Sequence, residues 1–213
     1  MESRMREIKS RHNNKIKIGI IPGHFATNHS HVNNYVDLTK IKTHHIVAKE
    51  AGKELAKAYA STCDIDTIIC LEGTEIIGAF LAEELSVTGH GSINSGKDIA
   101  VITPETNANN QMIFRDNIQK DIFNKRVMLL ISSVSTGKTI NRSVECLQYY
   151  NGQLAGVASI FSAINEYNGI DIKSIFTSDD LTGYETMSAN ECTLCKSGQK
   201  VDAIINSFGY SKI

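Results

Sequence analysis

The chain has 213 residues, a net charge of −1 and 41% hydrophobic residues, so it is long and apolar enough for one sizeable α/β domain, with or without a small appendage. Its near-neutral charge disfavours a nucleic-acid partner, and no apolar run approaches the ~20 residues of a membrane-spanning helix. An odd number of cysteines, five in all, indicates a reducing cytoplasm rather than a disulfide framework.

Strands and helices are predicted to alternate along the chain. Residues 1–14 are basic and are predicted to form a charged tail, so that one domain spans residues 15–213. Alternating strands and helices predict a mainly parallel sheet covered by helices on both faces. The predicted elements are, in order, a strand at 15–21 that ends at Pro22-Gly23, a histidine-rich hairpin or loop at 23–37, a helix at 41–59, a strand at 65–71, a turn at 72–74, a helix at 76–85, a strand at 98–102, a long polar loop at 103–124, a strand at 127–131, a turn at 135–139, a helix at 140–150, and strands at 154–161 and 172–176.

The segment 126–139, RVMLLISSVSTGKT, has the strongest functional pattern. A buried strand leads into a small, hydroxyl-rich turn that opens a helix. The free N–H groups at a helix N-terminus and the helix dipole favour an anion there, so this geometry predicts a phosphate site. The predicted phosphate-binding residues are those of the turn, namely Ser135, Thr136, Gly137, Lys138 and Thr139.

Three interpretations of this segment are open. Gly137-Lys138-Thr139 resembles the end of the P-loop motif GxxxxGK[ST], but Ser132 stands where that motif requires a glycine, and the turn is too short to wrap a triphosphate. The second interpretation is the phosphate loop of a type I phosphoribosyltransferase, in which an apolar strand precedes two acids and a Thr/Ser/Gly-rich turn. The third is an ordinary strand-to-helix turn that binds nothing.

From residue 23 to about residue 212 the chain resembles an orotate phosphoribosyltransferase, in matching order. The resemblance implies a type I phosphoribosyltransferase-like α/β fold, in which a central, mainly parallel sheet is flanked by helices and carries a small hood made from both ends of the chain. The segments that carry it, besides 126–139, are GHFATNHSHVNNYVDLTKI at 23–41, DTIICLEGTEIIGAFLAEEL at 66–85, IFTSDDL at 175–181 and ECTLCKSGQKV at 191–201, the last being similar to a Cys-Pro-Leu-Cys-x-x-Gly ending of one family branch.

The resemblance also implies an activity and a set of ligands. The family transfers ribose 5-phosphate from phosphoribosyl pyrophosphate (PRPP) to orotate in pyrimidine nucleotide synthesis, with Mg²⁺ as cofactor, in a cytoplasmic homodimer. By resemblance, Glu72, Gly73 and Thr74 form the pyrophosphate loop, and His24 and Phe25 lie near the base. The catalytic residues are not assigned.

Several positions depart from the family pattern. Ser132 and Ser133 replace the acidic pair that grips the ribose, Glu75 follows the pyrophosphate loop, and no cation occurs from Thr103 to Gln111. The nearest basic residue downstream is Arg115. An alternative function is therefore a non-catalytic sensor or regulator that binds a nucleotide or a sugar phosphate through the retained 5-phosphate loop. A third possibility is a structural or dimer-forming remnant.

Cys192 and Cys195 have the spacing of half a zinc knuckle. A complete site needs four ligands, and the sequence holds no second Cys-x-x-Cys. The histidines His24, His29 and His31 match no metal motif by their spacing. The sequence therefore predicts two free thiols and no metal site. If Cys192 and Cys195 did bind a metal, the other two ligands would have to come from Cys63, Cys70, Cys146 or a histidine.

Overall fold

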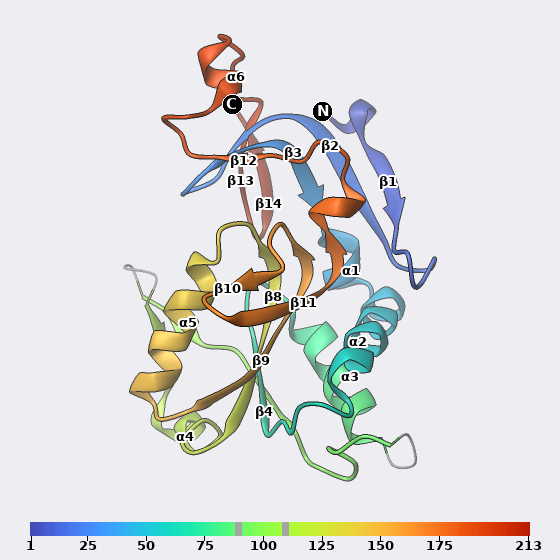
Figure 1. Ribbon diagram of the computed structural model, residues 1–213, viewed down its shortest axis with the longest axis vertical. Helices are drawn as coiled ribbons and strands as arrows, with labels where there is room; N and C mark the ends of the chain where they lie inside the picture. The colour runs from blue at the N-terminus through green and yellow to red at the C-terminus, as the bar shows by residue number, and fades with distance from the viewer. Residues whose placement is uncertain (88–90, 108–110) are drawn as a thin grey trace.

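The computed structural model describes residues 1–87, 91–107 and 111–213 as two stacked parts, a core sheet with its helices and a smaller hood above it (Figure 1). The core sheet is six-stranded, in the order β10-β11-β9-β8-β4-β5. Its strands are β4 (Thr67–Cys70), β5 (Ala100–Ile102), β8 (Arg126–Val134), β9 (Gln153–Ser162), β10 (Glu166–Tyr167) and β11 (Ile170–Thr177).

The core sheet is mainly parallel, as the sequence predicts. The pairs β4 with β5, β4 with β8, β8 with β9 and β9 with β11 are all parallel, and the short β10 joins β11 as an antiparallel hairpin. Strands of a parallel sheet are buried on both faces, which explains the continuous apolar run of β8. The predicted α/β architecture is confirmed.

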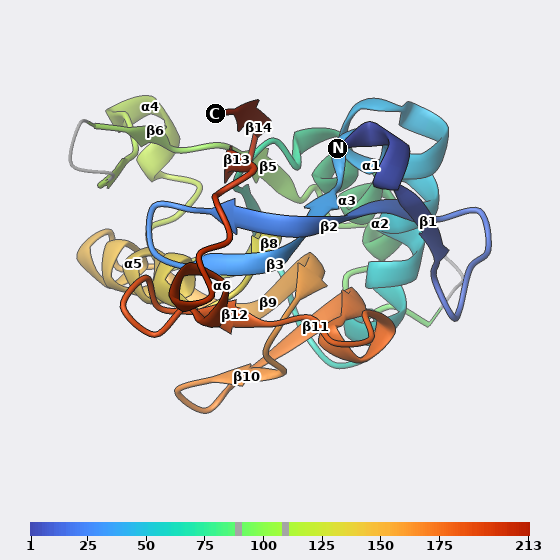
Figure 2. The ribbon, with the colours of Figure 1, turned by 90° about the horizontal axis from the view of Figure 1, so that it is seen from above.

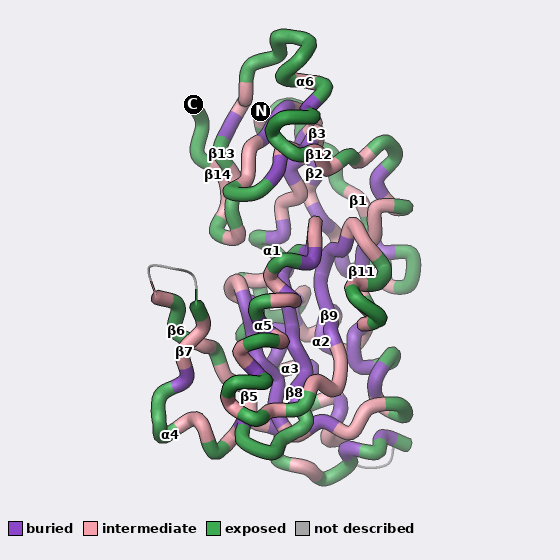
Figure 3. The backbone as a smooth tube through the Cα atoms, turned by 60° about the vertical axis from the view of Figure 1, so that its left-hand side comes forward, coloured by how far each residue is buried: buried purple, intermediate pink, exposed green. Residues whose placement is uncertain are grey.

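Helices cover both faces of the core sheet. Helices α2 (His45–Tyr59) and α3 (Glu75–Ser86) lie on one side and α5 (Lys138–Tyr149) on the other (Figure 1). Along β8, Met128 and Leu130 belong to the apolar cluster with α2 and α3, whereas Leu129 and Ile131 belong to the cluster with α5. This alternation follows from the two-residue period of a strand. Figure 3 shows the resulting buried interior along β8 and β9.

The hood combines strands from both ends of the chain. Its order is β12-β3-β2-β13-β14, with β1 pairing separately along β2. Seen from above, β2 and β3 run side by side across the hood, next to α6 (Figure 2). The hood strands are β1 (Arg6–Lys9), β2 (Lys17–Ala26), β3 (His31–Asp37), β12 (Thr186–Met187), β13 (Ala203–Asn206) and β14 (Gly209–Lys212), and the short helix α6 spans Thr193–Lys196.

The N-terminal half of the hood differs from the prediction in two places. Residues 1–14 are not simply a tail, because β1 pairs with β2 in an antiparallel register. The strand predicted to end at Pro22-Gly23 continues to Ala26 as part of β2. A register shift between Pro22 and Phe25 marks an irregularity there. Pro22 is the last residue paired with β3 before this irregularity, opposite Asn34, and proline is tolerated beside a bulge because it has no N–H to donate to the ladder.

Two further predictions are corrected. The helix predicted at 41–59 is divided into α1 (Thr39–Thr43) and α2 at His44, whose backbone is extended. The loop predicted at 103–124 contains the hairpin β6 (Glu105–Thr106) with β7 (Met112–Ile113), and the short helix α4 (Asp116–Gln119). Across the described ranges, no helix is both long and apolar enough to cross a membrane.

Candidate functional site

One cavity of about 700 Å³ opens between the hood and the carboxyl edge of the core sheet. In parallel α/β sheets this edge is where ligands bind. The size of the cavity suits a small-molecule ligand. Residues that line it from the core include Glu72, Glu75, Ser133, Ser135, Thr139 and Arg142, and those from the hood include Thr27, Asn28, His29, Asn34 and Tyr35.

The predicted phosphate turn lies at the edge of this cavity. β8 ends at Val134, and α5 begins at Lys138 after Gly137, which is its N-cap with a left-handed φ of 77°. The Ala163 N–H donates to the Val134 carbonyl over 2.8 Å, which ties the start of the turn to the chain leaving β9. The first N–H groups of α5 have no partner within the helix, so they are available to an anion.

The five turn residues do not contribute equally to the cavity. Ser135 and Thr139 line it, whereas Thr136, Gly137 and Lys138 do not. The Lys138 side chain is exposed, so its role as a phosphate cation has no geometric support. Ser135 and Thr139 are therefore the turn side chains best placed to meet a ligand.

Gly137 is required by both conformation and space. Its left-handed φ favours glycine, because other residues carry a Cβ that this conformation crowds. In addition, a Cβ at Gly137 would overlap the ring of Tyr167, which comes from the β10–β11 hairpin. The hairpin thus packs directly on the phosphate turn.

Ser132 and Ser133 lie at the end of β8, as predicted, but they face different surroundings. Ser132 is buried and Ser133 is exposed. The Ser133 N–H donates to Oε2 of Glu72 over 3.3 Å. The Glu72 carboxylate, from the β4–α3 turn, thus lies beside Ser133, one of the two serines that replace the acidic pair. Since β4 and β8 are adjacent parallel strands, the turns that follow them meet at the same edge.

The predicted pyrophosphate loop, Glu72 to Thr74, is firmly held. Its first two residues are left-handed, with φ of 62° at Glu72 and 81° at Gly73. The Thr74 hydroxyl is buried and is placed to donate to the carbonyls of Leu71, at 3.0 Å, and Leu130, at 3.1 Å. The second of these contacts fixes the loop to β8 and keeps Glu72 next to Ser133.

Lys42 is a cation beside this loop that the sequence did not single out. Its half-buried Nζ donates to the Glu72 carbonyl over 3.1 Å and also to the Ser207 carbonyl in the β13–β14 turn. Burial lowers the pKa of Lys42, and the nearby carboxylates oppose that effect. Burial raises the pKa of Glu72, against the lowering effects of the Ser133 N–H and of Lys42. Lys42 therefore joins α1, the pyrophosphate loop and the hood.

Glu75 and Arg142 complete the charged lining of the cavity. Glu75 is exposed in the first turn of α3, and its Oε1 accepts a hydrogen bond from the Thr103 hydroxyl over 3.1 Å. Arg142 lies one turn beyond the start of α5. Arg142 is not among the residues predicted from the sequence, although its spacing of three residues from Thr139 on a helix places both on one face.

The segment after β5 supplies little positive charge. Arg115, the nearest basic residue downstream, is engaged by Glu105 through two hydrogen bonds of 2.8 and 2.6 Å. Of the cation-free stretch 103–111, residues 108–110 lie outside the described residues. The described part includes the β6–β7 hairpin, and Thr103, Pro104 and Thr106 line the cavity.

His24 and Phe25 are not brought to the cavity. Both are completely buried. Phe25 packs in the hood core with Val32 and Tyr35, and the His24 N–H donates to Asp202 over 2.9 Å. The part of 23–31 that lines the cavity is its tip, 27–29. The resemblance predicts that His24 and Phe25 lie near the base, whereas in the structure the residues of this segment that line the cavity are Thr27, Asn28 and His29.

Comparison with family models gives no match, and comparison with curated proteins gives none either. Solved structures do match. Adenine phosphoribosyltransferase from Thermoanaerobacter pseudethanolicus is similar over 83% of this chain and 96% of its own, with a TM-score of 0.51 and 17% identity. UMP synthase from Leishmania donovani is similar over 70% of this chain and 31% of its own, with a TM-score of 0.51 and 17% identity.

A third similar structure is orotate phosphoribosyltransferase from Mycobacterium tuberculosis in complex with PRPP. It matches 69% of this chain and 82% of its own, with a TM-score of 0.51 and 18% identity. At such low identity the likeness concerns the fold. Together with the parallel core sheet, the hood and the strand-turn-helix at the cavity, it shows that this chain has the fold of the type I phosphoribosyltransferases.

Proposed function

We propose that this protein binds PRPP in the cavity between hood and core, and that it transfers ribose 5-phosphate to orotate or a related base. The observation that carries the proposal is the turn 135–139, which opens α5 at the edge of a cavity of about 700 Å³. The likeness to an orotate phosphoribosyltransferase that holds PRPP supports the same ligand class. We further propose that the protein is a cytoplasmic homodimer. Light scattering of the purified protein tests the dimer, and a mass equal to that of the monomer would contradict it.

The cavity offers a separate place for each part of the ligand. The 5-phosphate would accept hydrogen bonds from the N–H groups that open α5 and from the hydroxyls of Ser135 and Thr139, with Arg142 adding a positive charge. The ribose would lie beside Ser133. The base would lie under the hood, near His29. In the transfer, a base nitrogen forms a bond to ribose C1 as the bond from C1 to the pyrophosphate oxygen breaks.

The carboxylates on the pyrophosphate side fit a magnesium ion. Mg²⁺ is commonly held by one or two carboxylates together with substrate phosphates. Glu72 and Glu75 both line the cavity, and they would hold it with the pyrophosphate. When bound, the ion would neutralise charge on the leaving group. Without it, the two carboxylates would repel the pyrophosphate.

A second candidate function is a sensor or regulator that binds the same class of ligand without turnover. It is favoured by the two serines at 132 and 133 and by the lack of cations from 103 to 111. Removing a group that stabilises developing charge commonly costs on the order of 10²-fold in rate. A protein that has lost several of these charge-stabilising groups would still bind the ligand but would no longer turn it over.

Calorimetry with PRPP, orotidine monophosphate and ribose 5-phosphate, each with and without Mg²⁺, tests the proposal. We expect PRPP to bind, and to bind more tightly with Mg²⁺. Arg142→Ala should weaken binding about tenfold, because it removes a charge-assisted contact. Lys138→Ala is the matched control, since this exposed lysine does not line the cavity, and it should bind like the wild type.

The outcomes separate the two candidate functions. Consumption of orotate in the presence of PRPP and Mg²⁺ supports the transferase, whereas binding without consumption supports the sensor. If none of the three ligands binds, both functions are wrong, and the turn at 135–139 is an ordinary strand-to-helix connection.

The raised pKa of Glu72 predicts a pH dependence of binding. In EDTA, PRPP should bind more tightly as the pH falls from 8 to 5, because protonation of Glu72 removes a negative charge from the cavity. Loss of one such repulsion, ~1 kcal/mol, corresponds to about fivefold in affinity.

The phosphate groups of PRPP titrate in the same range, so the measurement needs the Glu72→Gln control. Dissociation constants are measured for both proteins across the range. The wild type should gain about fivefold over Glu72→Gln at low pH relative to high pH. Parallel curves would show that Glu72 does not face the ligand.

A further inference from the structure

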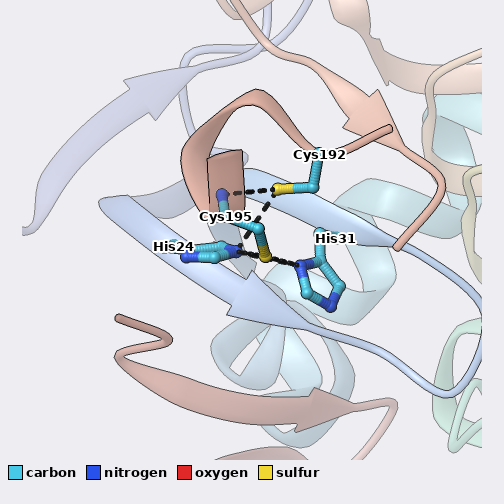
Figure 4. A group of neighbouring side chains, drawn as sticks. All are labelled: His24, His31, Cys192 and Cys195. Carbon is cyan, nitrogen blue, oxygen red and sulfur yellow. Dashed lines mark hydrogen bonds between the residues drawn. The ribbon is translucent and has the colours of Figure 1, made fainter. Parts of the chain in front are cut away.

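Four potential metal ligands from distant parts of the chain meet in the hood, where α6 lies against β2 and β3 (Figure 4). They are His24 on β2, His31 at the start of β3, and Cys192 and Cys195 at the N-cap and inside α6. One ligand atom from each residue lies within 4.8 Å of all the others. Figure 4 shows the four side chains pointing towards one another.

The separations between these atoms match those around a tetrahedral zinc ion. With Zn–N near 2.0 Å and Zn–S near 2.3 Å, tetrahedral ligand atoms stand roughly 3.3 to 3.8 Å apart. Here His24 Nε2 lies 3.4 Å from Cys192 Sγ and 3.6 Å from Cys195 Sγ. His31 Nδ1 lies 3.3 Å from Cys195 Sγ and 2.9 Å from His24 Nε2. Only a small outward shift of one ring is needed to admit the ion.

The groups around the cluster favour the same assignment. The other ring nitrogen of His24, Nδ1, lies 2.8 Å from the carbonyl of Gln199. A carbonyl can only accept, so Nδ1 carries the proton and Nε2 presents its lone pair to the cluster. The Cys195 N–H donates to Cys192 Sγ over 3.4 Å, which stabilises a thiolate there.

The composition of the cluster identifies both the metal and its role. Two thiols and two imidazoles in a tetrahedral arrangement are typical of structural zinc. Four protein ligands leave no open position for a substrate. His24 and Cys192 are fully buried, so on their side the ion would be shielded from solvent.

We propose that His24 Nε2, His31 Nδ1, Cys192 Sγ and Cys195 Sγ bind one Zn²⁺ ion, which fastens α6 to the β2–β3 hairpin. The sequence spacing predicts free thiols, because the two halves of the site are more than 160 residues apart; the fold brings them together.

The zinc site would also shape one wall of the cavity. His24 and His31 flank the turn between β2 and β3, whose residues 27–29 line the cavity. Within this turn the Thr27 hydroxyl accepts from the Ser30 N–H over 2.9 Å. An ion that holds both ends of the turn would therefore order the wall that faces the ligand, without touching the ligand itself.

Elemental analysis of the full chain, purified without a metal-affinity tag, tests this proposal. We expect about one Zn²⁺ per chain after incubation with zinc and gel filtration. Replacement by Co²⁺ should give the intense d–d absorption of a tetrahedral site with thiolate charge-transfer bands. Absence of stoichiometric zinc and of these bands would overturn the proposal.

Variants locate the ligands. Cys195→Ser and His31→Ala should each weaken zinc binding by roughly tenfold or more in competition with a chromogenic chelator. Two controls should keep the wild-type affinity, namely Cys146→Ser, which changes a thiol far from the cluster, and His29→Ala, which changes a neighbouring histidine of the same hairpin.

Equal losses in the controls and the ligand variants would overturn the assignment. Because Cys195 is exposed and His31 is only half-buried, these variants should remain folded, which circular dichroism checks. If they do not fold, the cobalt spectrum of the wild type still decides. PRPP binding is measured separately, so failure of the zinc site does not bear on the proposed ligand.

Discussion

Gly137→Ala should abolish measurable binding of PRPP, with an affinity at least about 100-fold below the wild type. Alanine at a φ of 77° costs roughly 1 kcal/mol or more, and its Cβ would overlap the Tyr167 ring. The turn must then move, which displaces the N–H groups at the start of α5 from the cavity. Calorimetry measures the affinity, and thermal unfolding shows whether the fold survives.

Gly169 offers a matched control for the backbone cost alone. Gly169 lies in the β10–β11 hairpin, near Tyr167, and has the same φ of 77° as Gly137. No described atom lies within 4 Å of a Cβ built at Gly169. Gly169→Ala should lose stability without loss of PRPP affinity. Gly137→Ala combined with Tyr167→Ala should recover part of the affinity, because the overlap is removed. If Gly137→Ala binds PRPP as Gly169→Ala does, the turn does not hold the phosphate.

The second large effect is expected at Gly52, where α2 crosses α3. A Cβ at this position would lie 2.8 Å from the Leu81 nitrogen and 2.9 Å from the Phe80 carbonyl carbon, both backbone atoms. A backbone cannot rotate aside as a flexible side chain can, so the two helices must separate. Overpacking of this kind costs ~1–3 kcal/mol.

Gly52→Ala therefore should lower the free energy of unfolding by about 2 kcal/mol, seen as a fall in the melting temperature of roughly 4–8 °C. Helix propensity alone predicts the opposite sign, since alanine is favoured over glycine by about 1 kcal/mol inside a helix. A denaturant titration decides between them. Stabilisation by Gly52→Ala would mean that α2 and α3 do not pack this closely.

The parts of the fold that could be predicted are those with a local pattern. The apolar run of β8, the hydroxyl-rich turn after it and the periodic helix α5 occupy one continuous segment, so their order indicated a strand, a phosphate turn and a helix. The same holds for β4 and α3. In each of these elements, the positions of the apolar residues within the element itself indicate which residues are buried.

The parts that could not be predicted depend on contacts between distant segments. Glu72 meets Ser133 because β4 and β8 are neighbours, which no local pattern reveals. Lys42 reaches both the pyrophosphate loop and the β13–β14 turn. The short, charged β1 became a strand only because β2 offers it an edge. In each case the deciding energy comes from a partner far along the chain.

The composite hood has a consequence for the order in which the molecule is built. The core strands are complete once Thr177 has been synthesised, and domains generally fold as units during synthesis. β2 is made much earlier, yet its neighbour β13 pairs with it only through Phe25 and Ala26, after residue 203 has emerged. β1 covers this edge of β2 only from Lys17 to Ile20, so until then the rest of the edge is open to strands of other chains. The nascent protein therefore carries a partly exposed, aggregation-prone edge while the core is made, and its ligand cavity, which Ile205 to Phe208 help to line, closes only after the core strands are complete.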